Sequence, residues 1–328
     1  MYQKKKKIER RSKTILKNCL NEEVMTELRA KSGIIIIDKH EGITSARIVS
    51  KIKRILGVKK VGHAGTLDPF ASGVLICCIN QGTKLARYFL KGTKTYEAVM
   101  FLGAETDTQD LTGKIVGEYP EIQYDINTIK KVFENFRGEY RQFPPLISAL
   151  KHKGTPLYKL ARKGNSVQKP ARLVNIYFIE ILDICIPEIY FRVQCSAGTY
   201  IRTLCSDIGK ALNSGAYLKS LVRTESSLFT KKEAVSLFEL EQLAKTGKWM
   251  DVLIPMEKAL RDTQSFNADD ILIKKIKFGN KINLQDIPFF NNQNKEILRI
   301  MDKCSRLIAV ISKEEKDEEI NVLRLPAL

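Results

Sequence analysis

The chain has 328 residues, 44% of them hydrophobic, which is enough for one large domain or for a core domain with a smaller appendage. Its 55 lysines and arginines against 37 acidic residues leave a formal charge of +18, which indicates a polyanionic partner, either nucleic acid or an acidic membrane surface. No apolar run approaches the roughly 18–20 residues of a membrane-spanning helix, and no apolar segment follows the basic start as in a secretory signal. We therefore expect a cytoplasmic protein that binds nucleic acid and no membrane.

The cysteines and histidines argue against a metal centre. The seven cysteines are odd in number and no two are spaced as C-x-x-C, so we expect reduced, buried thiols. None of His40, His63 and His152 lies near a cysteine pair, so the ligand clusters typical of zinc are missing from the sequence. We expect no metal.

The first predicted elements follow a basic start. Residues 1–13 carry seven cations against one acidic residue, and we interpret them as a solvated tail that is compatible with weak attraction to phosphate. Residues 45–57 repeat apolar side chains at helical spacing, with Thr44 or Ser45 as the cap and Gly57 as the stop. The next predicted elements are a buried strand over 74–79, a short helix over 83–90 and a strand over 94–103.

The middle of the chain contains two polar segments. Residues 105–113 have the composition of a solvated loop; calcium binding is the alternative, but the EF-hand spacing is absent. Residues 137–172 interleave many cations with aromatic residues, which suits a surface that follows a nucleic-acid backbone. The remaining patterns predict helices over 126–136 and 198–215, paired strands over 173–184 and 189–195, a strand over 217–229, and short strands after a boundary near 250–265.

One glycine-rich stretch, VGHAGTLDPFASGVL at 61–75, presents a single carboxylate. Pro69 disfavours helical backbone at Asp68 and keeps this residue extended, while Gly65 allows a tight turn and the close approach of a ligand. A carboxylate held in this way can act on a substrate, but Asp beside Gly and Pro is also a common turn or cap residue. The spacing alone leaves both interpretations open.

Arg202 indicates an acidic partner. It falls in the first turn of the helix over 198–215, for which we predict Thr199 as the cap. The helix dipole disfavours a cation there by roughly 0.3 kcal/mol or more. A cation in that position implies a neighbouring carboxylate; the alternative is a long side chain that extends into water.

Several motifs in the same order resemble those of a known family. GHAGTLDPFASGVL is followed by KTYEAVMFLGAETDTQDLTG and then by GTYIRTLCSDIG, and the likeness runs from about residue 33 to residue 229. The chain resembles the bacterial tRNA pseudouridine-55 synthase family, whose members convert a uridine in the tRNA T-loop from an N-glycosidic to a C-glycosidic link. The resemblance implies an isomerase that acts on the T-arm of tRNA and uses neither a metal nor an organic cofactor.

The resemblance also assigns roles to individual residues. It implies that Asp68 is the nucleophile, that Arg202 pairs with it, and that Tyr96 packs on the uracil ring and assists removal of the C5 proton. His63 resembles the histidine that stacks in the T-loop and helps to extrude the target base. The other implied positions are Tyr200 and Leu221 in the uridine pocket, and Lys39, Gly65, Thr66 and Pro69 as structural support.

Two features qualify this assignment. Aromatic and aliphatic side chains in strands are usually packing residues, so Tyr96, Tyr200 and Leu221 would be interpreted as core positions without the resemblance. His40 stands where the family's DKPxGxTS stretch has proline, which concerns the local turn rather than the chemistry.

The fold that the resemblance implies is α+β, with a mixed, largely antiparallel sheet, flanking helices and a small β-barrel-like C-terminal domain. We divide the chain into a basic N-terminal extension (1–32), a pseudouridine synthase catalytic domain (33–250) and a PUA-like RNA-binding domain (251–328). The segment at about 137–172 resembles the thumb insertion with which standalone enzymes grip tRNA. We expect a monomer that needs no guide RNA.

Two other functions are considered. An RNA-guided pseudouridine synthase subunit shares the aspartate motif but lacks the thumb insertion. A non-catalytic tRNA-binding or folding protein would not need Asp68, Tyr96 and Arg202 together, and all three are present. Turnover of an unmodified transcript without guide RNA separates the three.

Overall fold

The structure is a computed structural model that describes residues 27, 30–120, 125–287, 297–314 and 317–325. The basic start at 1–13 and most of the predicted N-terminal extension lie outside these residues. Among the described residues, no helix has the length and apolar character needed to cross a membrane.

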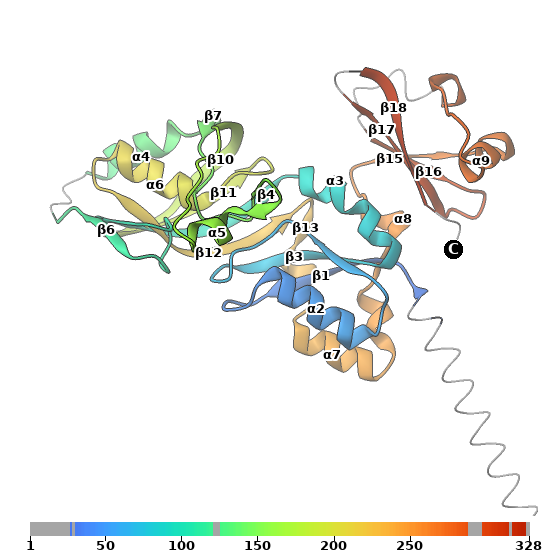
Figure 1. The fold of residues 1–328 in the computed structure, drawn as a ribbon, viewed down its shortest axis with the longest axis horizontal. Helices are drawn as coiled ribbons and strands as arrows, with labels where there is room; N and C mark the ends of the chain where they lie inside the picture. Colours follow the sequence, from blue (N-terminus) through green and yellow to red (C-terminus); the bar gives the residue numbers. More distant parts are fainter. Residues whose placement is uncertain (1–26, 28–29, 121–124, 288–296, 315–316, 326–328) are drawn as a thin grey trace, which may run out of the picture.

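A large sheet forms the centre of the molecule (Figure 1). Its strand order is β14-β1-β3-β12-β4-β11-β10-β7, and among its pairs only β12 with β3 is parallel in the described chain. The expected mixed, largely antiparallel sheet is therefore confirmed. The strands are β1 (Gly33–Lys39), β2 (Val61–Ala64), β3 (Ser72–Ile79), β4 (Lys94–Leu102), β7 (Gly138–Gln142), β10 (Arg172–Cys185), β11 (Glu188–Cys195), β12 (Ala216–Ser226), β13 (Phe229–Thr230) and β14 (Ile254–Pro255).

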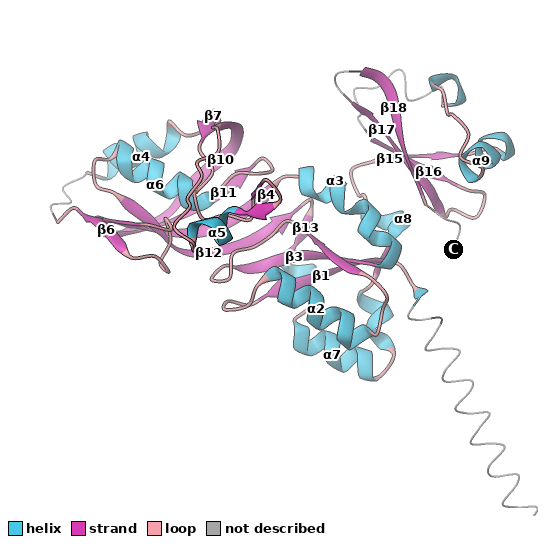
Figure 2. Ribbon diagram, viewed as in Figure 1, coloured by secondary structure: helices cyan, strands magenta, loops and turns pink. Residues whose placement is uncertain are grey.

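Helices cover this sheet in separate groups (Figure 2). At one end, α4 and α6 pack on β4, β10, β11 and β12. At the other end, β1 and β3 are buried on both faces, with α2 and α7 on one side and α3 and α8 on the other. The helices are α2 (Ser45–Leu56), α3 (Ala86–Lys91), α4 (Ile126–Glu134), α5 (Leu157–Ala161), α6 (Ile201–Ala211), α7 (Leu237–Lys245), α8 (Met256–Ala259) and α9 (Asp270–Lys277).

The alternation of side chains along β1 explains why this strand is apolar from Gly33 to Ile37. Ile34 and Ile36 face the cluster that includes α3 and α8, whereas Ile35 and Ile37 face the cluster that includes α2 and α7. Successive residues of a strand point to opposite faces, so a strand covered on both sides must be continuously hydrophobic. The GIIII run forms residues 33–37 of this strand.

Local signals in the sequence produce α2 as predicted. The Thr44 hydroxyl accepts a hydrogen bond from the Arg47 amide at 3.2 Å and caps the helix. Gly57 ends it with φ of 63°, a left-handed conformation that glycine adopts without strain. Ile48 and Ile52 are fully buried on the face turned to the sheet.

The C-terminal part forms a second sheet of order β15-β16-β17-β18. The three predicted short strands are present, but α9 and β15 were not predicted, and the described strands do not close into a barrel. Met301, Leu307 and Val310 of this sheet pack into the same cluster as β1 and α3. The strands are β15 (Gln264–Asn267), β16 (Ile297–Met301), β17 (Leu307–Glu314) and β18 (Asp317–Arg324).

Two smaller strand pairs complete the fold. The first pair consists of β5 (Ala104–Thr106) and β6 (Ile115–Glu118). The end of β5 overlaps the start of the expected polar loop over 105–113. The basic segment between β7 and β10 contains β8 (Lys151–His152), β9 (Thr155–Pro156) and the single-turn helix α5. The predicted helix over 83–90 divides into a 3₁₀ turn at Asn80–Leu85 followed by α3.

Candidate active site

A cleft of about 310 Å³ opens where the loop before β3, the strands β4 and β12, and the start of α6 meet. It gathers most of the predicted site residues. These are Gly65, Thr66, Asp68, Tyr96, Tyr200, Arg202 and Leu221. His63, Lys39 and Pro69 lie outside its lining.

Hydrogen bonds from the segment after β1 hold the loop that carries Asp68. The Ser45 hydroxyl bonds both polar backbone atoms of Leu67, at 3.0 and 3.1 Å, and the Gly42 amide donates to the Pro69 carbonyl at 2.8 Å. The carbonyl of Asp68 accepts from the Ala71 amide at 3.1 Å, which closes a turn around Pro69. The Asp68 side chain is 35% exposed in the cleft, so the loop presents it instead of burying it.

Lys39 supports this loop from beneath. Its side chain is fully buried, and its ammonium donates to the carbonyls of His40, Pro69 and Ala71, at 2.5 to 3.1 Å. Burial lowers the pKa of Lys39 to about 8, although the negative charge of Asp68 opposes the shift. The predicted structural role of Lys39 agrees with these contacts.

Arg202 has the acidic partner that its helix position predicted, and this partner is Asp68. The Arg202 Nε atom is 3.0 Å from Oδ2 of Asp68, and the Arg202 side chain is only 4% exposed. The rest of the guanidinium donates to the carbonyls of Thr108 and Ile147, each at 3.0 Å. The guanidinium is therefore fixed in one orientation by groups from three segments of the chain.

Asp110 is a second carboxylate at this arginine, and the sequence analysis missed it. Its Oδ2 atom is 3.5 Å from Arg202 and its side chain is 5% exposed, so the expectation of a solvated loop is wrong at this position. Its other oxygen accepts from the hydroxyls of Thr108 and Thr112 and from the Thr112 amide. The threonines at both sides of Asp110 were the available signal, because buried carboxylates need such donors.

The electrostatics of Asp68 result from opposing effects. Burial raises the pKa of its carboxyl group, and the charge of Asp110 acts in the same direction. Arg202 opposes both through its positive charge and its contact with the carboxylate. Arg202 thus favours the ionised form, which is the form that can act as a nucleophile.

Tyr96 lies on β4 and is 8% exposed at the floor of the cleft. Burial raises the pKa of its phenol, and the positive charge of Arg223 opposes this shift. Arg223 was also missed: it is 1% exposed, and it donates to the carbonyls of Val74 and Gly65 at 2.7 and 2.9 Å. It joins β12 to the loop of Asp68.

Gly73 shows how closely these elements pack. Its φ is +98°, and a Cβ atom there would lie 2.2 Å from the Arg223 carbonyl oxygen. Any side chain would separate β3 from β12 at the point where the two strands run parallel.

Tyr200 occupies the start of α6, where the sequence analysis predicted Thr199 as the cap. Tyr200 is the N-cap residue of α6, and no side chain caps the helix there, so the prediction for Thr199 is wrong. The Thr199 hydroxyl instead donates to the Ser196 carbonyl. The guanidinium of Arg172 lies 4.8 Å from the centre of the Tyr200 ring, in a cation–π contact at the rim of the cleft.

The remaining predicted residues have different surroundings. Leu221, on β12, is 6% exposed and lines the cleft. His63 is half-buried on β2, and its Nδ1 atom has no hydrogen-bond partner among the described residues. Burial, and secondarily Arg223, lower the pKa of His63. Lys94, which was not predicted, also lines the cleft and donates to three carbonyls at the end of α3.

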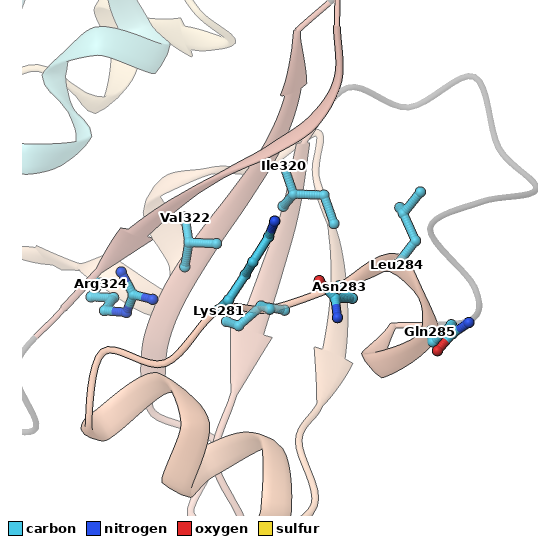
Figure 3. A pocket seen from close by; sticks show the side chains of 8 residues that line it. Lys281, Asn283, Leu284, Gln285, Ile320, Val322 and Arg324 are labelled. Carbon is cyan, nitrogen blue, oxygen red and sulfur yellow. The ribbon is translucent and has the colours of Figure 1, made fainter.

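A larger hollow lies in the second sheet (Figure 3). Its volume is about 560 Å³, and Lys281, Asn283 and Arg324 are among the side chains around it. Its described lining residues include no carboxylate, whereas the smaller cleft contains Asp68 with a paired arginine. The smaller cleft is therefore the candidate active site. Within the described residues, no group of three or more His, Cys, Asp or Glu side chains is placed to hold a metal ion.

Sequence comparisons connect this cleft to known enzymes. Residues 53–201 match the family described as TruB family pseudouridylate synthase (N terminal domain), and residues 202–261 match the tRNA pseudouridylate synthase B C-terminal domain. The tRNA pseudouridine synthase B of Syntrophotalea carbinolica is 42% identical over 248 residues, which is 76% of this chain and 81% of the relative. That of Clostridium novyi is 38% identical over 90% of this chain and its own full length.

The chain belongs to the TruB family of pseudouridylate synthases. It is therefore a pseudouridine synthase, and the cleft that contains Asp68 lies in the part matched by the two TruB domains.

Solved structures agree with this TruB assignment at the level of the fold. A complex of Cbf5 with Nop10 and Gar1 contains a chain that superposes with a TM-score of 0.69 at 27% identity, covering 92% of this chain and 86% of that one. An H/ACA RNP bound to a substrate RNA containing 2′-deoxyuridine gives a TM-score of 0.66 at 26% identity, with 90% and 85% covered. The pseudouridine synthase fold is thus shown over almost the whole chain.

Proposed function

We propose that this chain converts uridine 55 in the T-loop of tRNA to pseudouridine, with Asp68 as the nucleophile. The observation that carries the proposal is the pairing of Asp68 with the buried Arg202 in a cleft that is otherwise lined by uncharged and cationic groups. The curated relatives, named tRNA pseudouridine synthase B, support tRNA as the substrate.

The reaction breaks the bond from the sugar C1′ to N1 of uracil and forms a bond from C1′ to C5; C5 then loses its proton and N1 gains one, so the product is an isomer of the substrate. Attack of a carboxylate at C1′ or at C6 divides this difficult step into two through a covalent adduct. Initial elimination at the sugar is the third route, and it also needs an ionised carboxylate beside the nucleotide. In all three Asp68 is the group that acts, and Arg202 keeps it ionised and oriented.

The other side chains of the cleft have supporting roles in this proposal. The target base is buried in the folded T-loop, so it must be flipped out, at a cost of a few kcal/mol that stacking and pocket contacts offset. Tyr96 packs on the flipped ring and assists removal of the C5 proton, while Tyr200 and Leu221 line the pocket. His63 stacks in the T-loop in place of the extruded base.

Binding of tRNA rests on the cations of the chain, because phosphate contacts supply most of the affinity. The basic segment over 137–172 contributes Leu150 and Arg172 to the cleft, and we assign it the role of a thumb that grips the T-arm. We assign the second sheet, together with the rest of 251–328, to a PUA-like RNA-binding domain. The enzyme acts as a cytoplasmic monomer without cofactor.

The alternative is an RNA-guided subunit, since the solved neighbours include an H/ACA RNP. The identities favour the standalone enzyme: 36–42% for curated tRNA pseudouridine synthase B relatives against 26–27% for those structures. The purified chain and an unmodified tRNA transcript, with no guide RNA, decide between them. Pseudouridine at position 55 supports the proposal, and its absence, with product only after a guide is added, rejects it.

A further inference from the structure

The helix that carries Arg202 begins without a cap of its own. Tyr200 occupies the capping position with extended backbone, and neither its side chain nor the Thr199 hydroxyl bonds the free amides of the first turn. The first turn of a helix leaves backbone donors unsatisfied, so an uncapped start is poorly fixed. Arg202 lies two residues further on, and its Nε atom is 3.0 Å from the Asp68 carboxylate.

Gln142 holds the backbone of Tyr200 from a distant part of the sequence. It is the last residue of β7 and is fully buried. Its Oε1 atom accepts from the Tyr200 amide at 2.8 Å, and its Nε2 atom donates to the Tyr200 carbonyl at 3.0 Å. The same amide group contacts the Tyr140 hydroxyl. One side chain thus binds both polar backbone atoms of the residue that opens α6.

The position of Gln142 places these contacts at the base of the basic segment. Gln142 pairs with Arg172 in the register of β7 and β10, and the chain between them forms the predicted thumb. Arg172 lies over the Tyr200 ring. The two residues that begin and end this segment therefore hold the backbone and the ring of the same tyrosine.

We propose that Gln142 is a positioning residue for pseudouridine formation. It fixes the start of α6, and so holds the Tyr200 ring in the cleft and the Arg202 guanidinium against Asp68. The expected kinetic effect rests on the proposed function, whereas the hydrogen bonds between Gln142 and Tyr200 are a property of the fold. The Tyr200 carbonyl also accepts from the Leu204 amide at 3.0 Å, but the Tyr200 N–H bonds Gln142, so an apolar side chain at position 142 would leave this backbone donor without its acceptor.

The first test replaces Gln142 by methionine, which preserves length and removes the amide. The single-turnover rate on tRNA should fall at least about 30-fold, while the Kd for tRNA changes less than about threefold, because no phosphate contact is removed. The matched control is Gln194→Met on β11 of the same sheet, where the side chain is half-buried and, within the described part of the chain, bonds Thr95 alone, at 3.4 Å. The control should keep the wild-type rate, and a Gln142→Met rate within twofold of wild type would overturn the proposal.

A second readout does not depend on activity. Hydrogen exchange at the amides of 200–204 should become at least about tenfold faster in Gln142→Met, because the Tyr200 amide loses its acceptor. Exchange equal to wild type would show that Gln142 does not hold the helix. If the wild-type chain leaves uridine 55 unmodified, the proposed function fails. The exchange measurement still tests whether Gln142 holds the start of α6.

The Gln142→Glu variant separates positioning from a general loss of stability. Ionised glutamate can still accept from the Tyr200 amide but cannot donate to the Tyr200 carbonyl; protonated glutamate can do both. The ratio of the variant rate to the wild-type rate should therefore rise at least about fivefold as pH falls from 8 to 6. A merely destabilised fold gives a ratio that is flat or falls with acid, and either result would refute the positioning role.

Discussion

Replacing Arg202 by methionine tests both the stability of the site and its chemistry. The guanidinium is 4% exposed and serves two carboxylates and two carbonyls at once: Asp68 at 3.0 Å, Asp110 at 3.5 Å, and the carbonyls of Thr108 and Ile147 at 3.0 Å. Methionine fills similar space but pairs with none of them.

The expected loss of stability follows from what remains buried. Removing one partner of a buried ion pair costs roughly 3–5 kcal/mol, because the other charge stays without compensation. Asp110 is 5% exposed and cannot recover water, whereas Asp68 is 35% exposed and recovers part of its hydration. We therefore expect the lower end, about 3 kcal/mol, which corresponds to a fall in Tm of about 6–12 °C for a domain of this size.

The matched control is Arg192→Met. Arg192 also pairs with two carboxylates, Glu97 at 2.8 Å and Glu180 at 3.6 Å, but it is 41% exposed and its partners are 41% and 58% exposed. Exposed pairs are worth at most about 1 kcal/mol, so this variant should lose about 4 °C or less. Equal Tm losses in the two variants, measured by thermal unfolding, would refute the view that burial makes Arg202 important.

Activity and pH complete the test of Arg202. The single-turnover rate of Arg202→Met should fall at least about 100-fold, the size expected when a charge-stabilising group leaves an active site. Since Arg202 opposes the burial that raises the pKa of Asp68, its loss raises that pKa further. The ionised carboxylate then appears only at higher pH, so the acidic limb of the rate profile should move upward. A limb that stays in place would mean that Asp68 is not the group that titrates.

Three further predictions address the nucleophile, the basic segment and a strained turn. Asp68→Asn should form no pseudouridine while tRNA binds within a few-fold of wild type, since the nucleophile is lost and phosphate contacts stay; wild-type turnover would reject the mechanism. A short Gly-Ser linker in place of residues 151–166 should weaken tRNA binding at least tenfold, about 1.4 kcal/mol, with slower turnover persisting at saturation; unchanged binding would exclude a gripping role. Leu228 has φ of 67° and is 39% exposed, so Leu228→Gly should stabilise the fold by about 1 kcal/mol in thermal unfolding, and a loss would show that its packing outweighs the strain.

The sequence determined those elements whose causes are local. Thr44 and Gly57 bound α2 because a cap and a left-handed stop act within one turn of the chain. The turn around Asp68 could be predicted from the glycine and proline beside it, and an acidic partner for Arg202 from the dipole of its own helix, whereas the role of Asp68 was implied by the motif resemblance. Apolar periodicity likewise predicted the buried residues of α6, including Leu204 and Ile208, which are fully buried.

Only the tertiary structure decided which distant groups meet. Asp110 was assigned to solvent because its flanking threonines do not show that Arg202, 92 positions later, will contact it. Thr199 was predicted as a cap because the local pattern allows it, but Gln142 from β7 binds Tyr200 instead. Strand pairing between residues far apart in sequence brings these groups together, and short-range patterns contain no information about that pairing. The turn that presents Asp68 is thus readable in a few adjacent residues, whereas the groups that surround its carboxylate are set by the fold.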